Sequence, residues 1–383
     1  MRALHFGAGN IGKGFIGYLL SKNGYEVCFV DVNQQMIDHI NSHNRYDVEL
    51  LSDDRRIETI SPVSALNSIT QKDAVIERIV SADVITMSVG VQNLSKVAGV
   101  LAEGLKKRAA ANRKNINVMA NENAINASST LRKEVAEHLT QEEMNEICTF
   151  TAFPNTAVDR LALSRQSESG EIPMVEPFYE WVIDQSEKVD DGLPGLQGVT
   201  YTQDLTPFIE RKLYIVNMGH AAAAYLGHLK GYPTIRETLE NTELEALVKG
   251  AMKEAAGYIV QTFQADPNEL DQFIEKTVGR FKNPHVSDDV KRVGRAPVRK
   301  LGSRERLVHP TVSLFEKGHP VENLTEAIAA GFLFNAPEDE EAEKLQALIA
   351  ENGIEKAVQI ISGIKIQNLQ SKIVSKYNTL KNG

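Results

Sequence analysis

Three polar side chains with complementary chemistry are spaced along one expected helix. Lys212, Asn217 and His220 stand five and three residues apart in the stretch 206–226, whose apolar periodicity predicts a helix. At about 100° of rotation per residue, an α-helix places all three within less than half of its circumference. Gly219 removes a side chain from this surface, which favours close approach of a substrate or a neighbouring domain. The spacing therefore predicts that the three side chains converge on one small ligand.

The chemistry of these side chains suits the oxidation of an alcohol. A hydride leaves a carbinol carbon only if a base, a metal ion or both take the hydroxyl proton. The nine histidines are scattered and neither Cys28 nor Cys148 has a suitable neighbour, which favours a mechanism without a metal ion. Lys212 is then the available base, provided that burial or nearby positive charge lowers its pKa. Asn217 and a second asparagine could hold the alkoxide.

Two segments in the first half of the chain carry polar residues that could complete this site. Asn121 and Asn123 follow a predicted strand, and ligands of open α/β sheets bind at the carboxyl ends of the strands. Either asparagine could instead be a turn residue. The segment 153–160 reads Phe-Pro-Asn-Thr-Ala-Val-Asp-Arg. Its Asp159 and Arg160 could simply form a surface ion pair.

The first 31 residues have the features of a dinucleotide-binding βαβ unit. An apolar strand runs into a G-x-G-x-x-G turn and a helix start, and the next strand ends in an acid about 20 residues later. The turn and helix start suit a pyrophosphate, and the acid suits a ribose diol. That carboxylate would repel a 2′-phosphate, so the pattern favours NAD over NADP. The residues expected to hold the cofactor are Gly7, Gly9, Asn10, Ile11, Gly12 and Asp31.

The elements that must position these residues divide the chain into two parts. Strand and helix patterns alternate over the first ~150 residues, which predicts an α/β fold with a Rossmann-type doubly wound sheet. Long helical periodicities follow, so the second domain is expected to be mainly α-helical. A polar stretch at 166–172 reads as a turn, and the glycine-rich stretch 188–198 marks the domain change. We therefore expect domains at 1–195 and 196–383. The expected strands are Ala3–Phe6, Glu26–Val30, Val84–Met87, Ile116–Ala120 and Cys148–Phe153.

Length and charge exclude several classes of protein. A chain of 383 residues exceeds the usual limit of one hydrophobic core, so two domains are expected. The net charge of −9 disfavours broad binding to nucleic acid or to a membrane surface. The first strand leaves no room for a signal peptide, and no apolar run is long enough for a membrane span. We expect a cytoplasmic protein.

Two of these motifs resemble those of a known family. The segment 153–160 resembles the F-P-N-x-x-V-D-R signature of mannitol dehydrogenases. The spacing of Lys212, Asn217 and His220 is similar to the K-x₄-N-x₂-H motif of the polyol-specific long-chain dehydrogenases/reductases. Together with the opening turn, the resemblance covers essentially the whole chain. It implies a monomeric polyol oxidoreductase with an N-terminal Rossmann domain and a helical C-terminal domain, in agreement with the NAD-dependent, metal-free chemistry inferred from the residues.

The resemblance also implies a role for each residue of the site. The lysine is the general base, Asn217 and Asn123 form an oxyanion hole, and the histidine orients the substrate. Asp159 is implied to pass protons to the lysine. A partner acid is common in the family three residues before the lysine, but Ile209 stands there and Glu210 follows it. The sequence therefore does not decide whether two acids, Asp159 and Glu210, form a proton gate.

A basic cluster near the end of the chain indicates what the substrate carries. Residues 291–306 hold seven Lys or Arg against the single acid Glu305. A phosphate dianion is the simplest ligand for such a cluster, and Arg295, Arg299 and Lys300 are the expected contacts. The alternative is a solvated helix face, and the lack of interleaved aromatic residues argues against nucleic acid. The family resemblance also implies a phosphorylated substrate. The expected reaction is the interconversion of D-mannitol 1-phosphate and D-fructose 6-phosphate.

Two alternatives to this function stay open. One is a dehydrogenase of an unphosphorylated polyol, or a hexuronate reductase, on the same scaffold. The other is a binding module that senses the ratio of NADH to NAD without turnover. Such a module needs the glycines and Asp31 but has no use for Lys212, which in that case simply extends to water.

Overall fold

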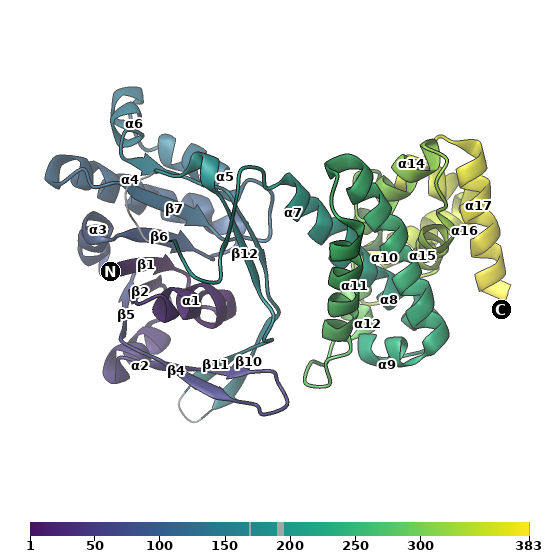
Figure 1. Ribbon diagram of the computed structural model, residues 1–383, viewed down its shortest axis with the longest axis horizontal. Coiled ribbons are helices and arrows are strands. Elements are labelled where there is room, and N and C mark those ends of the chain that lie inside the picture. Colours follow the sequence, from purple (N-terminus) through teal and green to yellow (C-terminus); the bar gives the residue numbers. More distant parts are fainter. Residues whose placement is uncertain (168–169, 190–194, 383) are drawn as a thin grey trace. The chain divides into compact units, whose positions relative to one another are not determined.

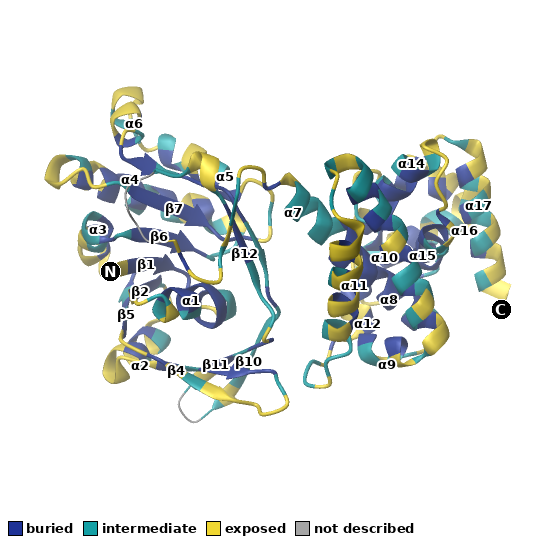
Figure 2. Ribbon diagram, in the orientation of Figure 1, coloured by how far each residue is buried: buried dark blue, intermediate teal, exposed yellow. Residues whose placement is uncertain are grey.

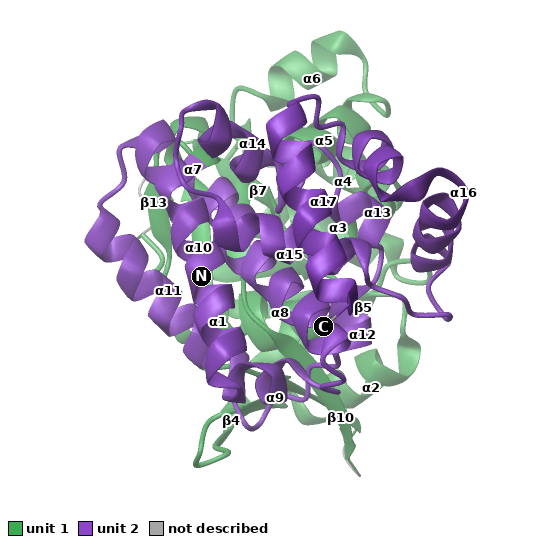
Figure 3. Ribbon diagram, turned by 90° about the vertical axis from the view of Figure 1, so that its right-hand side faces the viewer, with its two compact units in different colours: residues 1–206 green, residues 207–383 purple. Residues whose placement is uncertain are grey.

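The computed structural model describes residues 1–167, 170–189 and 195–382. The chain divides into two units, Met1–Thr206 and Pro207–Gly383, which Figure 3 shows in different colours. Buried residues gather on the sheet strands of the first unit and on the inner helix faces of the second (Figure 2). Each unit therefore has its own hydrophobic core, as expected for a chain of this length.

A six-stranded parallel sheet forms the centre of the first unit (Figure 1). Its order places the first strand in the middle, which is the doubly wound arrangement predicted from the sequence. The predicted strand at 148–153 shrinks to two residues, and one strand of this sheet, at 63–67, is not predicted. In spatial order the strands are β5 (Val63–Asn67), β2 (Glu26–Asp31), β1 (Arg2–Phe6), β6 (Val84–Met87), β7 (Ile116–Ala120) and β8 (Thr151–Ala152).

Helices cover both faces of this sheet, and each face has its own apolar cluster. Because neighbouring residues of a strand point to opposite faces, Leu4 packs with α3 and α4 while Ala3 packs with α1 and α2. The glycine-rich turn after β1 leads into the helix on the second of these faces. The helices of this unit are α1 (Tyr18–Lys22), α2 (Gln34–His43), α3 (Lys72–Ser81), α4 (Leu94–Ala111), α5 (Ala127–Ala136) and α6 (Gln141–Ile147).

Two smaller sheets complete the first unit, and the sequence patterns do not predict them. Their orders are β10-β11-β3-β4 and β13-β12-β9. The prediction of a turn at 166–172 is wrong for its described residues, because Gln166 pairs with Glu171 across the β10–β11 hairpin. The stretch reads as polar because β10 is an edge strand. The strands are β3 (Tyr46–Leu50), β4 (Ile57–Ile60), β9 (Thr156–Asp159), β10 (Ala162–Ser167), β11 (Gly170–Val175), β12 (Glu180–Asp184) and β13 (Thr200–Thr202).

Some of the sequence-based predictions fall partly on residues that the structure does not describe. Residues 168–169 belong to the stretch predicted as a turn, and 190–194 belong to the stretch predicted to hold the domain change. These positions lie outside the described residues.

The second unit is mainly α-helical in its described part, as predicted. The apolar periodicity over 239–264 predicts a single helix, but the structure has two. The first ends at Glu240, and Asn241 caps the second by accepting hydrogen bonds from the backbone N–H groups of Glu243 and Leu244. No helix within the described ranges is both long and apolar enough to cross a lipid bilayer. The helices are α7 (Thr206–Arg211), α8 (Met218–Leu229), α9 (Ile235–Glu240), α10 (Thr242–Phe263), α11 (Pro267–Phe281), α12 (Val290–Gly294), α13 (Pro297–Lys300), α14 (Val308–Glu316), α15 (Glu322–Phe332), α16 (Glu340–Ser362) and α17 (Gln367–Asn382).

Among the described residues, two helical segments have π-helical geometry. They are π-helices, η1 (Gly12–Gly17) and η4 (Lys212–Asn217), in which the backbone hydrogen bonds span five residues instead of four. The sequence pattern predicts one α-helix at 11–22 and one at 206–226, and the two π-helices interrupt these stretches. Because π-helical turns are rare and often occur at functional sites, both mark places to examine for ligand binding.

Candidate active site

The proposed catalytic side chains begin in the second π-helix. Lys212 and Asn217 are its first and last residues, and five residues of a π-helix complete about one turn. They therefore lie one above the other on the same side, closer than α-helical rotation predicts. His220 follows on the first turn of α8. The π-helix thus brings the residues predicted as base and amide donor onto one face.

His220 is held in one orientation by its neighbours. Its ring stacks on Phe281, with centroids 4.7 Å apart and 15° between the planes. Its Nε2 lies 2.6 Å from Oδ2 of Asp288, a close approach rather than an aligned hydrogen bond. Burial and the positive charges of Arg292 and Lys300 lower its pKa to about 3. The imidazole is therefore neutral at pH 7, despite the nearby carboxylate.

The glycine next to this histidine does not serve the purpose predicted for it. A Cβ on Gly219 would lie 2.7 Å from the sulfur of Met252, a residue of α10. Gly219 is buried and allows α8 and α10 to pack closely. The prediction that it opens the helix surface to substrate is wrong, because the surface it opens is already covered by another helix of the same unit.

The basic cluster separates into buried and exposed members. Lys300 is 6% exposed and donates to the carbonyl of Val293. Burial, reinforced by Arg306 and Arg299, lowers the pKa of Lys300 to about 7. Arg295 and Arg299 are exposed, and Arg299 lies 3.9 Å from the acid Glu305. Of the three predicted phosphate contacts, only the lysine is enclosed by protein.

Part of the cluster is used in ion pairs, as the alternative interpretation expects. Lys291 pairs with Glu338 at 2.9 Å, and Arg292 pairs with Asp288, the carboxylate that also contacts His220. The ion pair of Lys291 is exposed and contributes little to stability. The pair with Asp288 is different, because that carboxylate is 8% exposed and connects the cluster to the histidine.

The glycine-rich turn has the geometry that a dinucleotide requires. Gly7 has φ +95°, and a Cβ there would lie 2.5 Å from the backbone oxygen of Ser88. A Cβ on Gly12 would lie 1.9 Å from the oxygen of Gly7. A Cβ on Gly9 would meet nothing within 4 Å. Two glycines are therefore needed to close the turn, and the third leaves open space at a helix N-terminus, where a pyrophosphate fits.

Asp31 lies against this turn, as its position in the sequence predicts. Its Oδ2 accepts a hydrogen bond from the backbone N–H of Ala8 at 2.7 Å. Its Oδ1 accepts from the N–H groups of Val32 and Asn33 at 2.7 and 3.0 Å. A carboxylate offers about four acceptor positions, so about one remains for a ribose hydroxyl. Asn10 and Ile11 lie at the start of the helix that follows the turn.

Three apolar residues near this turn were missed by the sequence-based predictions. Val32, Ile69 and Val91 are 63%, 73% and 40% exposed, and each closely follows the carboxyl end of β2, β5 or β6. Exposed apolar side chains at the ligand-binding edge of a sheet suit the faces of a flat aromatic base. The available signal was an apolar residue just beyond a strand, within an otherwise polar loop.

The loop after β7 distinguishes its two asparagines. Asn123 is exposed, whereas Asn121 is 1% exposed, and neither amide atom of its side chain has a partner within the described residues. Glu122 lies between them and accepts hydrogen bonds from the backbone N–H groups of Val89 and Gly90 at 2.8 and 3.0 Å. Burial raises the pKa of Glu122. The loop is thus fixed by its acid and presents Asn123 at the surface.

The signature segment contains no surface ion pair of Arg160. This arginine is 8% exposed, and it donates to the carbonyl oxygens of Glu176 and Gly14 at 3.0 and 2.9 Å. The surface interpretation of Arg160 is therefore wrong, because the side chain points into the unit. Asp159 lies at the end of β9 and is partly buried.

Glu210 is engaged inside the second unit. Its Oε2 accepts a hydrogen bond from the hydroxyl of Tyr258, a residue of α10, at 2.9 Å. Burial and this bond raise the pKa of Tyr258 to about 12. The tyrosine is therefore a stable donor to Glu210 at neutral pH.

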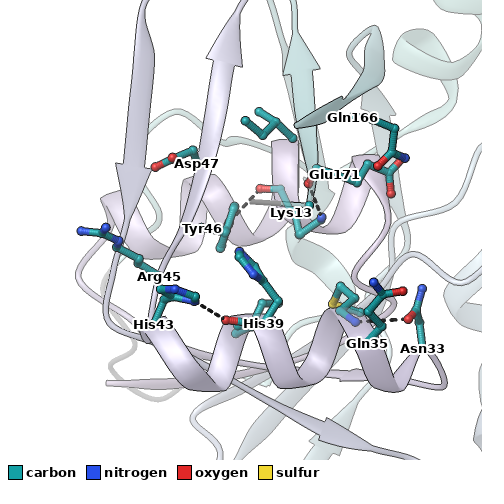
Figure 4. A pocket seen from close by; sticks show the side chains of 14 residues that line it. Lys13, Asn33, Gln35, His39, His43, Arg45, Tyr46, Asp47, Gln166 and Glu171 are labelled. Atoms are coloured by element: carbon teal, nitrogen blue, oxygen red, sulfur yellow. Dashed lines mark hydrogen bonds between the residues drawn. The ribbon is translucent and has the colours of Figure 1, made fainter. Parts of the chain in front are cut away.

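A cavity of about 410 Å³ lies between α2, η1 and the strands β3 and β11 (Figure 4). Lys13 and Tyr46 point into the space beside His39 (Figure 4). The hydroxyl of Tyr46 donates to the backbone oxygen of Lys13 at 2.8 Å, and Nζ of Lys13 donates to the oxygen of Glu171 at 3.1 Å. None of the residues predicted to bind cofactor or substrate lines this cavity.

Two protein-family models match the chain. The model of the mannitol dehydrogenase Rossmann domain matches residues 1–198, and that of the mannitol dehydrogenase C-terminal domain matches 204–381. The chain belongs to the mannitol dehydrogenase family. It is therefore an oxidoreductase, and the resemblance inferred from its two motifs is confirmed.

Relatives of this family match the chain over nearly its full length. It is 44% identical over 374 residues to a mannitol-1-phosphate 5-dehydrogenase of Bacillus licheniformis, with 98% of each chain covered. It is 43% identical over 379 residues to the enzyme of that name from Bacillus subtilis, covering 99% of this chain and 100% of the relative.

Solved structures of the family confirm the fold. A Pseudomonas fluorescens mannitol 2-dehydrogenase in ternary complex with NAD and D-mannitol is 21% identical, with a TM-score of 0.71, covering 100% of this chain and 92% of that one. A D-sorbitol dehydrogenase is 17% identical, with a TM-score of 0.86, covering 99% and 93%. At 21% and 17% identity, these comparisons establish the fold alone.

Proposed function

We propose that this family member interconverts D-mannitol 1-phosphate and D-fructose 6-phosphate, with NAD as the hydride acceptor and without a metal ion. The observation that carries the proposal is the face of η4 and α8, where Lys212, Asn217 and His220 gather. The full-length relatives named for this reaction support the choice of substrate. NAD, when bound at the turn after β1, supplies the acceptor for the hydride.

In the proposed mechanism, Lys212 in its neutral form takes the hydroxyl proton of the polyol. The amide groups of Asn217 and Asn123 donate hydrogen bonds to the oxygen as negative charge develops on it. Neutral His220 holds a neighbouring substrate oxygen, and its fixed ring gives that contact a defined direction. Each group thus acts on the reacting carbon or beside it.

Asp159 is proposed to pass the proton from the lysine toward solvent. We leave Glu210 out of this step, because its carboxylate already accepts a hydrogen bond from Tyr258. The partner acid three residues before the lysine is replaced by Ile209. The proposal therefore uses one acid where the family pattern commonly has two.

Lys300 is proposed as the principal contact of the substrate phosphate, with Arg295 and Arg299 at its edge. A buried cation makes a stronger ion pair than an exposed one, because water screens it less. Burial and the neighbouring arginines lower the pKa of this lysine, so a phosphate dianion beside it would favour its charged form. We also propose that the enzyme works as a monomer, which light scattering of the purified protein tests.

The test compares phosphorylated and free substrates under the same conditions. NADH oxidation is followed with D-fructose 6-phosphate and with D-fructose. We expect kcat/KM for the phosphate to exceed that for the free sugar by at least about 100-fold, since a charge-assisted contact is lost without it. Equal values would contradict the phosphate proposal. The absence of turnover with either sugar would favour the sensing module instead.

A further inference from the structure

The signature segment 153–160 has connections that the proposed mechanism does not use. We propose that it is a positioning device: Arg160 at one end fixes the dinucleotide-binding helix, and Asn155 and Thr156 at the other end fix the loop that carries Asn123. The inference rests on the proposed function only where it is tested by measuring turnover. Its readout of cofactor affinity needs no catalysis.

Arg160 binds the backbone of η1 directly. Its Nη1 donates to the oxygen of Gly14 at 2.9 Å, two residues beyond the last glycine of the turn. Its Nε donates to the backbone oxygen of Glu176, the residue after β11, at 3.0 Å. This second bond anchors the guanidinium to the end of that strand. A planar group with two fixed bonds has little freedom to rotate. The carbonyl of Gly14 is therefore held in a defined place.

Three aromatic rings enclose the same guanidinium. Its carbon lies 5.8, 5.3 and 5.3 Å from the ring centroids of Phe15, Tyr18 and Tyr179. Burial lowers the pKa of Arg160 to about 10, so the side chain keeps its charge at pH 7. A buried cation needs such partners, because losing its water is costly. Phe15 belongs to η1 and Tyr18 begins α1, so the arginine touches this helix by side chains as well as by backbone.

The first turn of η1 packs closely on the β10-β11-β3-β4 sheet. A Cβ on Gly14 would lie 2.6 Å from Val175 of β11. The hydroxyl of Tyr46 in β3 donates to the backbone oxygen of Lys13, and Nζ of that lysine donates to the backbone oxygen of Glu171 (Figure 4). Arg160 adds a charged bond to the next carbonyl of the same turn. A helix held at consecutive carbonyls cannot shift without moving the glycine-rich turn that precedes it.

The other end of the segment holds both ends of the loop after β7. The hydroxyl of Thr156 donates to the oxygen of Ala120, the last residue of β7, at 3.1 Å. The side chain of Asn155 exchanges two hydrogen bonds with Ser129 of α5, at 2.7 and 3.1 Å. Asn123 lies between these two attachment points. Loosening either one therefore frees the proposed oxyanion donor.

The experiment for the first end compares Arg160→Met with Arg108→Met. Arg108 is a matched control: it is 1% exposed and also donates to backbone oxygens of the first unit, those of Ile79, Val80 and Ala82. Both variants are expected to lower Tm. Only Arg160→Met is expected to raise the Kd of NADH, by at least about tenfold in a fluorescence titration, while Arg108→Met stays within about twofold.

An unchanged Kd in Arg160→Met would overturn the inference, and so would an equal rise in both variants. If Arg160→Met does not fold, Arg160→Lys is measured instead. Lysine keeps the charge but not the planar pair of bonds, so we expect a rise of at least about threefold. A Kd like that of the wild type would overturn the inference in this variant too.

The second end is tested with Thr156→Val, which removes the hydroxyl and keeps the shape suited to a strand. We expect kcat to fall about fivefold while the Kd of NADH stays unchanged. An unchanged kcat, or a loss of NADH affinity equal to that of Arg160→Met, would contradict separate roles for the two ends. A wild type without turnover of either sugar would contradict the proposed function, yet leave the comparison of NADH affinities intact.

Discussion

The two π-helices of this enzyme are built in opposite ways. In η1, three of the six residues are glycine, and side chains from other elements hold its backbone oxygens. In η4 there is no glycine, and the first and last residues are Lys212 and Asn217. In the proposed function, the turn that precedes the first segment offers backbone and open space to the cofactor, whereas the second segment offers functional groups to the substrate.

This difference predicts different weaknesses. A site made of backbone fails when atoms are added to it, because the space that receives the ligand is filled. A site made of side chains fails when atoms are removed, because the reacting groups are lost. The following substitutions break or sharpen this contrast.

The largest effect is expected from Lys212→Ala. Loss of the general base should lower kcat by at least about 10³-fold while the Kd of NADH stays within about twofold. Steady-state kinetics and a fluorescence titration measure the two quantities. If kcat survives, η4 is not the catalytic segment and the contrast fails.

In the glycine turn, the expected effect comes from an added methyl group. Gly12→Ala places a Cβ 1.9 Å from the oxygen of Gly7, so the turn must shift and stability should fall. Gly9→Ala meets nothing within 4 Å in the protein, so its Tm should stay close to that of the wild type. Both should weaken NADH binding, by about 100-fold and about tenfold respectively. Normal NADH affinity in Gly9→Ala would show that the open space is not the phosphate site.

Lys300 should make substrate affinity depend on pH. Its pKa is lowered to about 7, so the ammonium is charged below pH 7 and loses its proton above it. The KM for D-fructose 6-phosphate should therefore rise by up to about tenfold between pH 7 and 8, where the phosphate remains a dianion. Lys300→Met should have a high and constant KM. The exposed Lys291→Met serves as control and should keep the pH dependence of the wild type.

The smallest effect is expected from removal of metal ions. The proposed base and amide donors need no cation, so prolonged dialysis against a chelator should leave kcat unchanged. Activity that disappears and returns only with added zinc would contradict the use of Lys212 as the sole proton acceptor.

Much of the first domain could be predicted from sequence because its signals are local. The strands around β1 are apolar runs next to glycine or an acid, and their order follows from the alternation of strand and helix. Strand β5 and the two smaller sheets of the first unit are not predicted from the sequence. Short or polar strands, such as edge strand β10, are stabilised by pairing with residues distant in the sequence. Local pattern carries no information about such partners.

The candidate site divides in the same way. The spacing of Lys212, Asn217 and His220 identified a shared face, but only the backbone hydrogen bonds of η4 reveal the π-helical turn. The purposes of Gly219 and Arg160 were misread, because each depends on a contact far away in sequence, with Met252 and Gly14 respectively. The type of a residue shows which interactions its side chain can make. Its tertiary contacts determine which of these interactions it makes in the folded protein.

The central claim is that the amine of Lys212 accepts the substrate proton. Chemical rescue of Lys212→Ala by added primary amines tests it most directly, with oxidation of D-mannitol 1-phosphate followed as NADH formation. The account predicts that free amine base restores turnover, and that the rate increases with the pKa of the amine, as expected for general base catalysis. Turnover that no amine restores, with NADH still bound normally, would contradict it.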